Sequence, residues 1–147
     1  SVLPLLMVRL GASGPEAVGA IHCGWRGTVS GIVPRAVRAL AGTRPERLRC
    51  ALGPSISLRA FEVGPEVIER AKESLGGDPP PTHPGPRGRD HLDLPAVVRM
   101  HLERAGVNGS SIDDLALCTY SRPEQFFSYR RDGRCGHHLA VIGWRAD

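Results

Sequence analysis

The sequence predicts a single α+β domain, and three observations support this prediction. The chain has 147 residues, a length that suits one compact domain. Hydrophobic residues make up 41% of the sequence and charged residues 23%, which is typical of globular proteins. Short apolar runs with strand character alternate loosely with segments whose apolar residues recur at helical spacing. No apolar run reaches the roughly 18 residues that span a bilayer, so no membrane segment is expected.

The first third of the chain predicts two strands and a helix. Val2–Leu10 and Ala17–His22 are nearly all apolar, so we expect strands that are buried on both faces. After a Gly-Trp-Arg-Gly turn, apolar residues recur at helical spacing as far as Ala41. Pro34 lies inside this pattern and should either start the regular helix or kink it, because it lacks a backbone donor. Gly42 is a suitable helix C-cap.

The remaining two thirds predict further strands and helices in alternation. Strands are expected at Leu48–Leu52, Ile112–Thr119 and His137–Trp144. Helices are expected at Pro65–Leu75 and Pro95–Ala105, each with proline in its first turn. Between these helices, residues 76–90 hold five prolines in fifteen positions, which predicts a surface loop.

Charge gives little support for a nucleic-acid partner. The net charge is +4, and Lys72 is the only lysine among nineteen basic residues. An arginine excess of this kind fits either phosphate contact or the codon bias of a GC-rich genome. The arginines are scattered among 15 acidic residues without a dense run or interleaved aromatic residues, so no nucleic-acid interface is predicted.

The four cysteines favour a reducing compartment. None of them stands in a CxxC motif, and no secretory signal precedes them, so free thiols and a cytoplasmic location are expected. Cys50 and Cys118 lie in apolar, strand-like runs, where a thiol behaves as a small hydrophobic group.

The segment Ala20–Thr28 has the strongest character of a functional site. A buried strand ends in His22 and is followed at once by a glycine-flanked turn and a helix start. Such a helix start offers unpaired amide donors to an anion, and Arg26 adds a planar cationic fork. Taken singly, His22 also fits a structural role and Arg26 a surface ion pair, so the prediction depends on their combination.

A second cluster runs from Cys118 to Gly133. Phe126 and Phe127 would form a wall for a planar ring, while Arg130 and Arg131 would hold anions. A core aromatic pair followed by a polar turn explains the same residues equally well.

These two clusters resemble the YfiH-like laccase-domain family. The segment His-Cys-Gly-Trp-Arg-Gly-Thr is similar to the family's His-Ala-Gly-Trp-Arg-Gly signature. Further matches follow in the family's order and span nearly the whole chain: Gly53–Ile56, Phe61–Gly64, Leu92–Leu94, Leu117–Thr119 and Phe126–Gly133.

The resemblance implies a fold and an activity. The family fold is a layered α/β/β/α arrangement with mixed sheets, shared with the catalytic domain of cytotoxic necrotizing factor. The implied activity is zinc-associated purine nucleoside phosphorolysis of adenosine or inosine, with adenosine deamination in some members. By the same resemblance, His22 would be catalytic and a metal ligand, Arg26 catalytic and substrate-binding, and Phe127 and Arg130 substrate-binding.

The chain departs from the family pattern at the implied metal site. Family members hold the metal with two histidines and a cysteine, and the cysteine stands two residues before a proline. Counting back from Pro4 gives Val2, with Ser1 where the family has aspartate. The other histidine lies in an N-terminal part of the family domain that is missing from this chain. Cys23 is not expected to replace these ligands, since neighbouring residues of a strand point to opposite faces.

Two alternatives to the phosphorylase therefore stay open. The first is a non-catalytic domain that binds nucleosides or another protein. The second is copper-dependent polyphenol oxidation, which is disfavoured because the histidines of the chain show no common ligand spacing. The missing part would also leave one side of the sheet exposed, so we expect a second copy or a partner chain to cover it.

Overall fold

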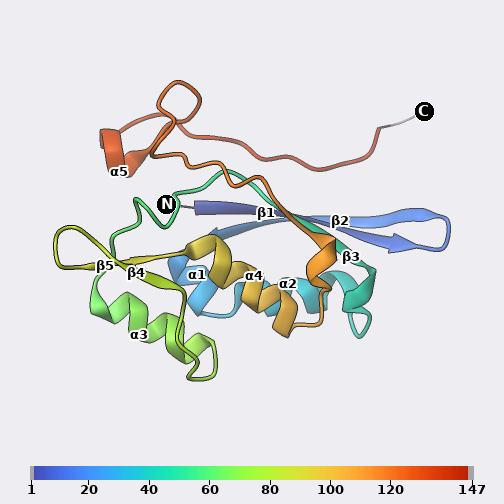
Figure 1. The fold of residues 1–147 in the computed structure, drawn as a ribbon. Helices are drawn as coiled ribbons and strands as arrows, with labels where there is room; N and C mark the ends of the chain where they lie inside the picture. The colour runs from blue at the N-terminus through green and yellow to red at the C-terminus, as the bar shows by residue number, and fades with distance from the viewer. Residues whose placement is uncertain (1, 146–147) are drawn as a thin grey trace.

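The computed structural model describes residues 2–145 and has an α+β architecture (Figure 1). Its centre is a four-stranded sheet in the order β2-β1-β3-β6. The strands are β1 (Val2–Gly11), β2 (Gly14–Gly24), β3 (Leu48–Leu52) and β6 (Ile112–Asp114). β1 pairs antiparallel with β2 and with β3, whereas β3 pairs parallel with β6, so the sheet is mixed as expected.

Only one face of the long hairpin β1–β2 is buried. Leu3, Leu5 and Met7 alternate along β1 and are completely enclosed. The residues between them keep partial exposure, and most of β2 is partly or fully exposed. The expectation that both faces are buried is therefore wrong, because helices cover one face of the hairpin only (Figure 1).

Four helices lie on that side of the sheet: α1 (Trp25–Val29), α2 (Ile32–Ala41), α3 (Pro65–Ser74) and α4 (Leu94–Arg104). The expected first helix is split in two, since Gly31 between α1 and α2 has a left-handed φ of 91°. Pro34 is the third residue of α2, so it belongs to the start of the helix and causes no kink. The N–H of Gly42 bonds to the carbonyl of Arg38, which confirms this residue as the C-cap.

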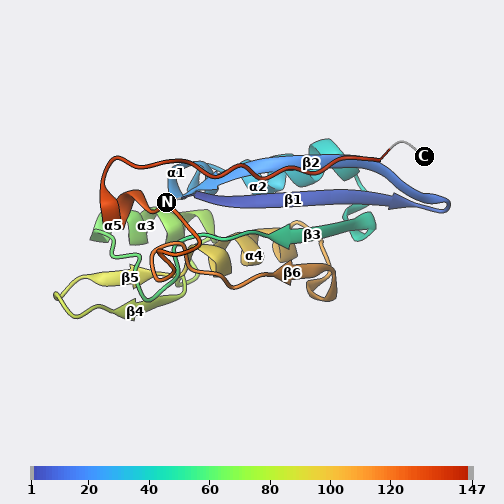
Figure 2. The same cartoon turned by 90° about the horizontal axis from the view of Figure 1, so that it is seen from above.

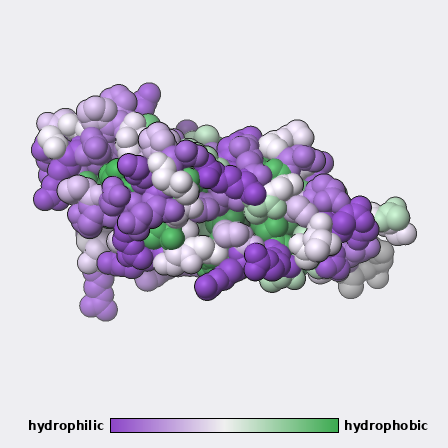
Figure 3. All heavy atoms as spheres, turned by 90° about the horizontal axis from the view of Figure 1, so that it is seen from below, coloured by the Kyte–Doolittle hydropathy of each residue, from purple (hydrophilic) through white to green (hydrophobic). Residues whose placement is uncertain are grey.

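The outer surface of the helical layer is polar. Seen from the helical side, the molecule is largely hydrophilic, with small hydrophobic patches between polar residues (Figure 3). The apolar residues of the helices face inward instead, and Val33, Val97 and Leu102 are fully buried against the sheet. The hydrophobic core therefore lies between this layer and the sheet.

Two expected segments differ in the structure. The proline-rich stretch is not all loop, because β4 (Thr82–Pro84) pairs antiparallel with β5 (Asp90–Leu92). The strand expected over Ile112–Thr119 ends at Asp114, since Ala116 adopts a left-handed φ of 52° that interrupts the pairing.

The C-terminal segment passes across the other face of the sheet. After α5 (Tyr129–Asp132), the chain runs along β1 and β2 on the side opposite the helices (Figures 1 and 2). The strand expected at His137–Trp144 does not form, because this segment has no backbone hydrogen bonds to a neighbouring strand among residues 2–145. Leu139, Val141 and Trp144 remain 58–88% exposed.

No helix within residues 2–145 has the length and apolar character needed to cross a membrane.

Candidate functional site

One end of the sheet collects the chain segments that carry the site. β2, β3 and β6 all finish at this end, and β1 begins there. Gly53 follows β3 directly and donates its N–H to the carbonyl of Pro4 at 2.9 Å. A Cβ at this glycine would come within 2.5 Å of Pro4 Cγ, so glycine allows the end of β3 to approach the start of β1 closely.

His22 lies at this end and faces away from the helices. It pairs with Pro4 across the hairpin, and the next pair, Leu3 and Cys23, points into the core. The His22 side chain is exposed, whereas Cys23 is completely buried. Burial raises the pKa of the Cys23 thiol to about 12. The expectation that Cys23 points away from the His22 site is thus confirmed.

A cavity of about 320 Å³ adjoins His22. It is lined by Val2, His22, Gly24, Trp25, Arg26 and Gly27. Thr28 is fully buried, and its hydroxyl donates to the carbonyl of Gly24 at 2.8 Å, which fixes α1 against the end of β2. The expectation of a long helix with its N-terminus at this site is wrong, because α1 has only five residues and contributes little helix dipole.

Two guanidinium groups meet at Trp25. Arg26 lies 4.8 Å from the centre of the indole ring, and Arg70 of α3 lies 5.5 Å from it. Neither arginine makes a salt bridge with a carboxylate among residues 2–145. Cation–π contacts hold both side chains without neutralising them, and Arg26, which lines the cavity, gives it a positive charge suited to an anion. Sequence reasoning missed Arg70, since only the packing of α3 against α1 brings it here.

The helix α5 lies at the same end of the sheet (Figure 1), and it contains Arg130 and follows Phe127 by two residues. Phe127 is 51% exposed, and its ring centre is 5.5 Å from that of His138. Arg130 donates to the carbonyl of Glu62 at 2.9 Å and lies 5.5 Å from the centre of the Phe61 ring. Neither Phe127 nor Arg130 lines the His22 cavity, which is formed by β1, β2 and α1 alone.

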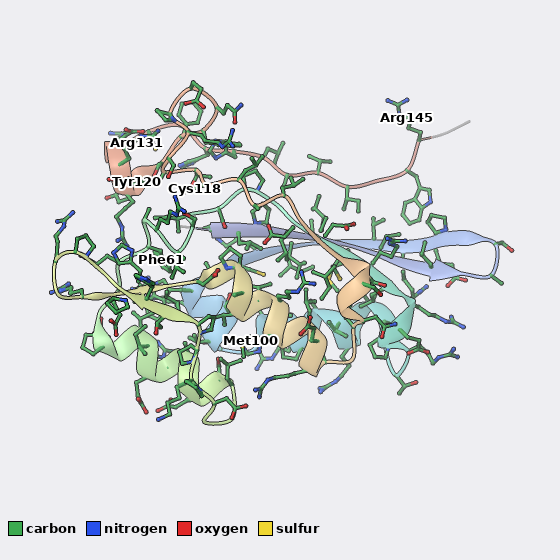
Figure 4. The ribbon with its side chains drawn as sticks, in the orientation of Figure 1. Phe61, Met100, Cys118, Tyr120, Arg131 and Arg145 are labelled. Carbon is green, nitrogen blue, oxygen red and sulfur yellow. The ribbon has the colours of Figure 1, made fainter. Side chains whose placement is uncertain are left out.

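Arg131 has a structural role and is not available to an anion. Its five N–H groups bond to the carbonyls of Thr119, Tyr120 and Phe126 and to both carboxylate oxygens of Asp132. These contacts fold residues 119–132 into a closed loop at the end of the sheet (Figure 4). The interpretation of Arg131 as an anion holder is therefore wrong, because a guanidinium offers five donors and all are used here.

The residues around His22 do not fit the implied zinc or copper site. Among residues 2–145, His22 is the only imidazole, thiol or carboxylate that lines the cavity. Val2 lines it too, at the position where the resemblance implies a metal-binding cysteine, and an alkyl side chain cannot coordinate a metal. The part of the chain that the structure describes contains no group of three or more His, Cys, Asp or Glu side chains placed to hold a metal. Ser1 lies outside the described residues.

A second cleft, of about 460 Å³, lies at the same end of the sheet and includes Cys118. This thiol is partly exposed, so the expectation that it behaves as a buried hydrophobic group is wrong, whereas Cys50 is buried as expected. Partial burial by itself raises the pKa of the Cys118 thiol. Hydrogen bonds from Ser121 and Ser57 outweigh this effect and lower the pKa to about 7.

Comparison with known proteins supports a family assignment. The family model described as "Multi-copper polyphenol oxidoreductase laccase" matches residues 3–145. The purine nucleoside phosphorylase of Xylella fastidiosa is 39% identical over 139 residues, which cover 95% of this chain and 53% of that protein. The purine nucleoside phosphorylase YfiH of Shigella flexneri is 38% identical over 143 residues, which cover 95% of this chain and 55% of that protein.

A solved structure agrees with these matches. YlmD from Geobacillus stearothermophilus superposes with a TM-score of 0.79 at 34% identity, covering 90% of this chain and 49% of YlmD. The chain thus spans about half the length of the relatives that it matches. It belongs to the multi-copper polyphenol oxidoreductase laccase family, and it shares the fold of that family's YfiH-type members.

Proposed function

We propose that this chain contributes the site at His22 and Arg26 to a purine nucleoside phosphorylase. The reaction would transfer the ribosyl group of adenosine or inosine to phosphate, giving the free base and ribose 1-phosphate. The observation that carries the proposal is an arginine without a carboxylate partner among residues 2–145, beside an exposed histidine in one cavity. Relatives named purine nucleoside phosphorylase support it.

The proposed role of Arg26 is to hold phosphate. A guanidinium donates two parallel hydrogen bonds to a phosphate and remains charged at every working pH. Its contact with the Trp25 ring restricts the side chain before the anion binds. Arg70 adds a second positive charge at the same ring, and it raises the local concentration of an anionic substrate.

His22 would act on the sugar side of the reaction. Cleavage of the glycosidic bond builds positive charge on the ribose and negative charge on the departing purine, and fixed polar groups stabilise such charges. An imidazole in the cavity would hydrogen-bond the phosphate or the leaving base. Phe127 and Arg130 are proposed as the base-stacking and substrate-holding residues of the neighbouring C-terminal segment. No step of the reaction is assigned to a metal, because residues 2–145 do not contain a set of side chains placed to bind one.

A second candidate is nucleoside binding without turnover. The observation that favours it is Val2, which lies in the His22 cavity at the position of the family's metal-binding cysteine. A site that keeps its anion-binding arginine but lacks this ligand would still bind nucleoside and phosphate.

An assay of the purified chain with inosine and phosphate tests the proposal. Released hypoxanthine is measured, together with bound zinc and with inosine formed when adenosine is the substrate. The Arg26→Ala variant should lose about ten- to a hundredfold in kcat/KM, since a hydrogen bond to a charged group contributes about 1.5–3 kcal/mol. Arg35→Ala is the matched control, because Arg35 is exposed on α2 and does not line the cavity.

Each result of the assay has a clear meaning. Turnover that falls in Arg26→Ala but not in Arg35→Ala supports the phosphorylase. Binding of inosine without turnover supports the second candidate instead. The absence of both inosine binding and turnover would overturn both candidate functions. Equal activity in Arg26→Ala and Arg35→Ala would show that Arg26 is not part of the site.

A further inference from the structure

The cleft that contains Cys118 is distinct from the His22 cavity. It lies between the connection Gly53–Arg59 that follows β3, the start of α4, and the segment Asp114–Arg122 that follows β6. It shares no lining residue with the His22 cavity. Its function is therefore a separate question, and an inference drawn from it does not depend on the proposed phosphorylase.

Backbone pairing brings Cys118 and Ser55 together although 63 positions separate them in the sequence. The two residues form an isolated parallel bridge, in which Ser55 N–H bonds to the Leu117 carbonyl at 3.1 Å and Thr119 N–H bonds to the Ser55 carbonyl at 2.9 Å. Paired residues of parallel strands project their side chains to the same side, at a strand spacing of about 4.8 Å. The side chains of Ser55 and Cys118 thus project to the same side of this bridge.

The Ser55 residue is nearly enclosed, and its hydroxyl has no hydrogen-bond partner within residues 2–145. Ser55 is only 4% exposed and lines the cleft. Among residues 2–145, no side-chain hydrogen bond is formed by its hydroxyl, and every fully enclosed side-chain oxygen or nitrogen has a partner. The hydroxyl therefore keeps its small accessible area toward the cleft, where a bound molecule would satisfy it.

The sulfur of Cys118 is arranged as a hydrogen-bond acceptor. The backbone N–H of Ser57 and the hydroxyl of Ser121 each donate to Sγ at 3.4 Å. Donors on a sulfur favour the thiolate, which is the nucleophilic form. The pKa of about 7 agrees with this geometry.

Two arginines and two aspartates line the cleft. Arg59 and Arg122 make no salt bridge with a carboxylate within residues 2–145. Asp93 and Asp114 also line the cleft, but each uses one carboxylate oxygen to accept a backbone N–H, from Ala96 and Ala116 respectively. Arg122 donates one N–H to Gln125 Oε1 at 3.4 Å, and the remaining donors of the two guanidinium groups are available to a ligand.

We propose that this cleft is a thiol-exchange site, in which Cys118 reacts with small anionic disulfides. The Cys118 thiolate attacks one sulfur of the disulfide and forms a new S–S bond, while the original S–S bond breaks and the other half leaves as a thiolate. Arg59 and Arg122 bind the carboxylates of the reagent, and the Ser55 hydroxyl donates to it. A free thiol reverses the reaction by the same exchange, so the site is a reversible modification site.

The other cysteines provide internal controls. Cys23 and Cys50 are 0% and 2% exposed, and burial raises their pKa values to about 12 and about 11. They should not react in the folded protein. Cys135 is partly exposed but does not line the cleft, so Cys135→Ser is the matched control for Cys118→Ser.

The test uses the whole chain and two disulfide probes at neutral pH. The dianionic probe is dithiobis(nitrobenzoate), whose coloured leaving thiolate is followed by absorbance, and the neutral probe is hydroxyethyl disulfide. Mass spectrometry of peptides locates each adduct. We expect one fast phase on Cys118, at least about fivefold faster than the same cysteine in the urea-unfolded chain, because more of it is thiolate when folded.

Variants separate the parts of the proposal. Cys118→Ser should abolish the fast phase, and Cys135→Ser should keep it. The double variant Arg59→Ala, Arg122→Ala should slow the dianionic probe about threefold or more while leaving the neutral probe unchanged. A fast phase that survives in Cys118→Ser, or a folded rate no higher than the unfolded one, would overturn the proposal. Equal slowing of both probes in the double variant would overturn the anionic preference.

Discussion

Two consecutive arginines of the C-terminal segment have different roles at the residue scale. Arg131 uses all five N–H groups inside the loop of residues 119–132. Arg130 makes one hydrogen bond, to the carbonyl of Glu62, and retains the rest of its donors. The contact with Asp132 raises the pKa of Arg131 and lowers that of the carboxyl group, so this pair stays ionised. Arg131 therefore shapes the loop that carries Phe127 and Arg130.

Replacement of Arg131 by lysine should loosen this loop although the charge is kept. Lysine has three donors on one nitrogen and cannot reach three carbonyls and a carboxylate at once. We expect amide hydrogen exchange between Thr119 and Gly133 to become at least about tenfold faster, while exchange in β1 stays the same. Arg134→Lys, at an exposed position of the same segment, is the control. Unchanged protection in Arg131→Lys would refute the structural role.

The residues of the two cavities differ in how far sequence predicts them. His22, Trp25 and Arg26 stand within five positions, so the local pattern of strand end, glycine turn and helix start indicates their site directly. Ser55 and Cys118 are joined by a parallel bridge between distant segments, and neither segment contains a motif that specifies this pairing. The apolar run around Cys118 predicted a thiol that behaves as a small hydrophobic group. In the structure the thiol is partly exposed and lines a cleft.

At the scale of elements, predictions were correct where a segment pairs or packs locally. β1, β3, α3 and α4 fall within one or two residues of the predicted bounds, because periodicity and proline positions specify them. The pairing of β4 with β5 inside the proline-rich stretch was missed, since a strand of three residues has too little periodicity to detect. The strand expected at His137–Trp144 has apolar residues, but it lacks a partner strand among the described residues.

The contact between α3 and α4 contains a titratable group that predicts a pH dependence. Ser74 Oγ donates to the carbonyl of Ala71 at 2.7 Å and lies 3.1 Å from Nε2 of His101, so the ring acts as donor in its neutral form. Burial, together with the nearby Arg104 charge, lowers the pKa of His101 below its ordinary value of 6.5. The ring can donate this hydrogen bond in either protonation state, so burial and the Arg104 charge are what favour the neutral form in the folded protein.

Stability should therefore fall on acidification in a way that depends on His101. Its contribution is complete above pH 6.5, where the ring is neutral in both states, and is lost as the pH falls through the lower pKa of the folded state. Urea unfolding at a series of pH values should show a steeper loss of stability below pH 6.5 for the native chain than for His101→Gln. The exposed His83 provides the control variant His83→Gln, and identical slopes in all three proteins would contradict the prediction.

At the scale of the whole molecule, the hydrophobic core and the two candidate sites occupy different regions. The core lies between the sheet and the helical layer, while both cavities lie at the single end where β1 begins and the other three strands finish. The opposite face of the hairpin is crossed by the C-terminal segment without hydrogen-bonded strands (Figure 2). Coverage of this face by a second copy or a partner chain stays a prediction.

The most direct test of the central claim is to map where a nucleoside binds on the molecule. NMR chemical shifts of the isotopically labelled chain are compared before and after addition of inosine with phosphate. We predict shifts at His22, Trp25 and Arg26 and in the neighbouring strand ends, with none at the distant hairpin turn Gly11–Gly14, and loss of these shifts in Arg26→Ala. An unchanged spectrum, or shifts confined to residues away from this end of the sheet, would contradict the account.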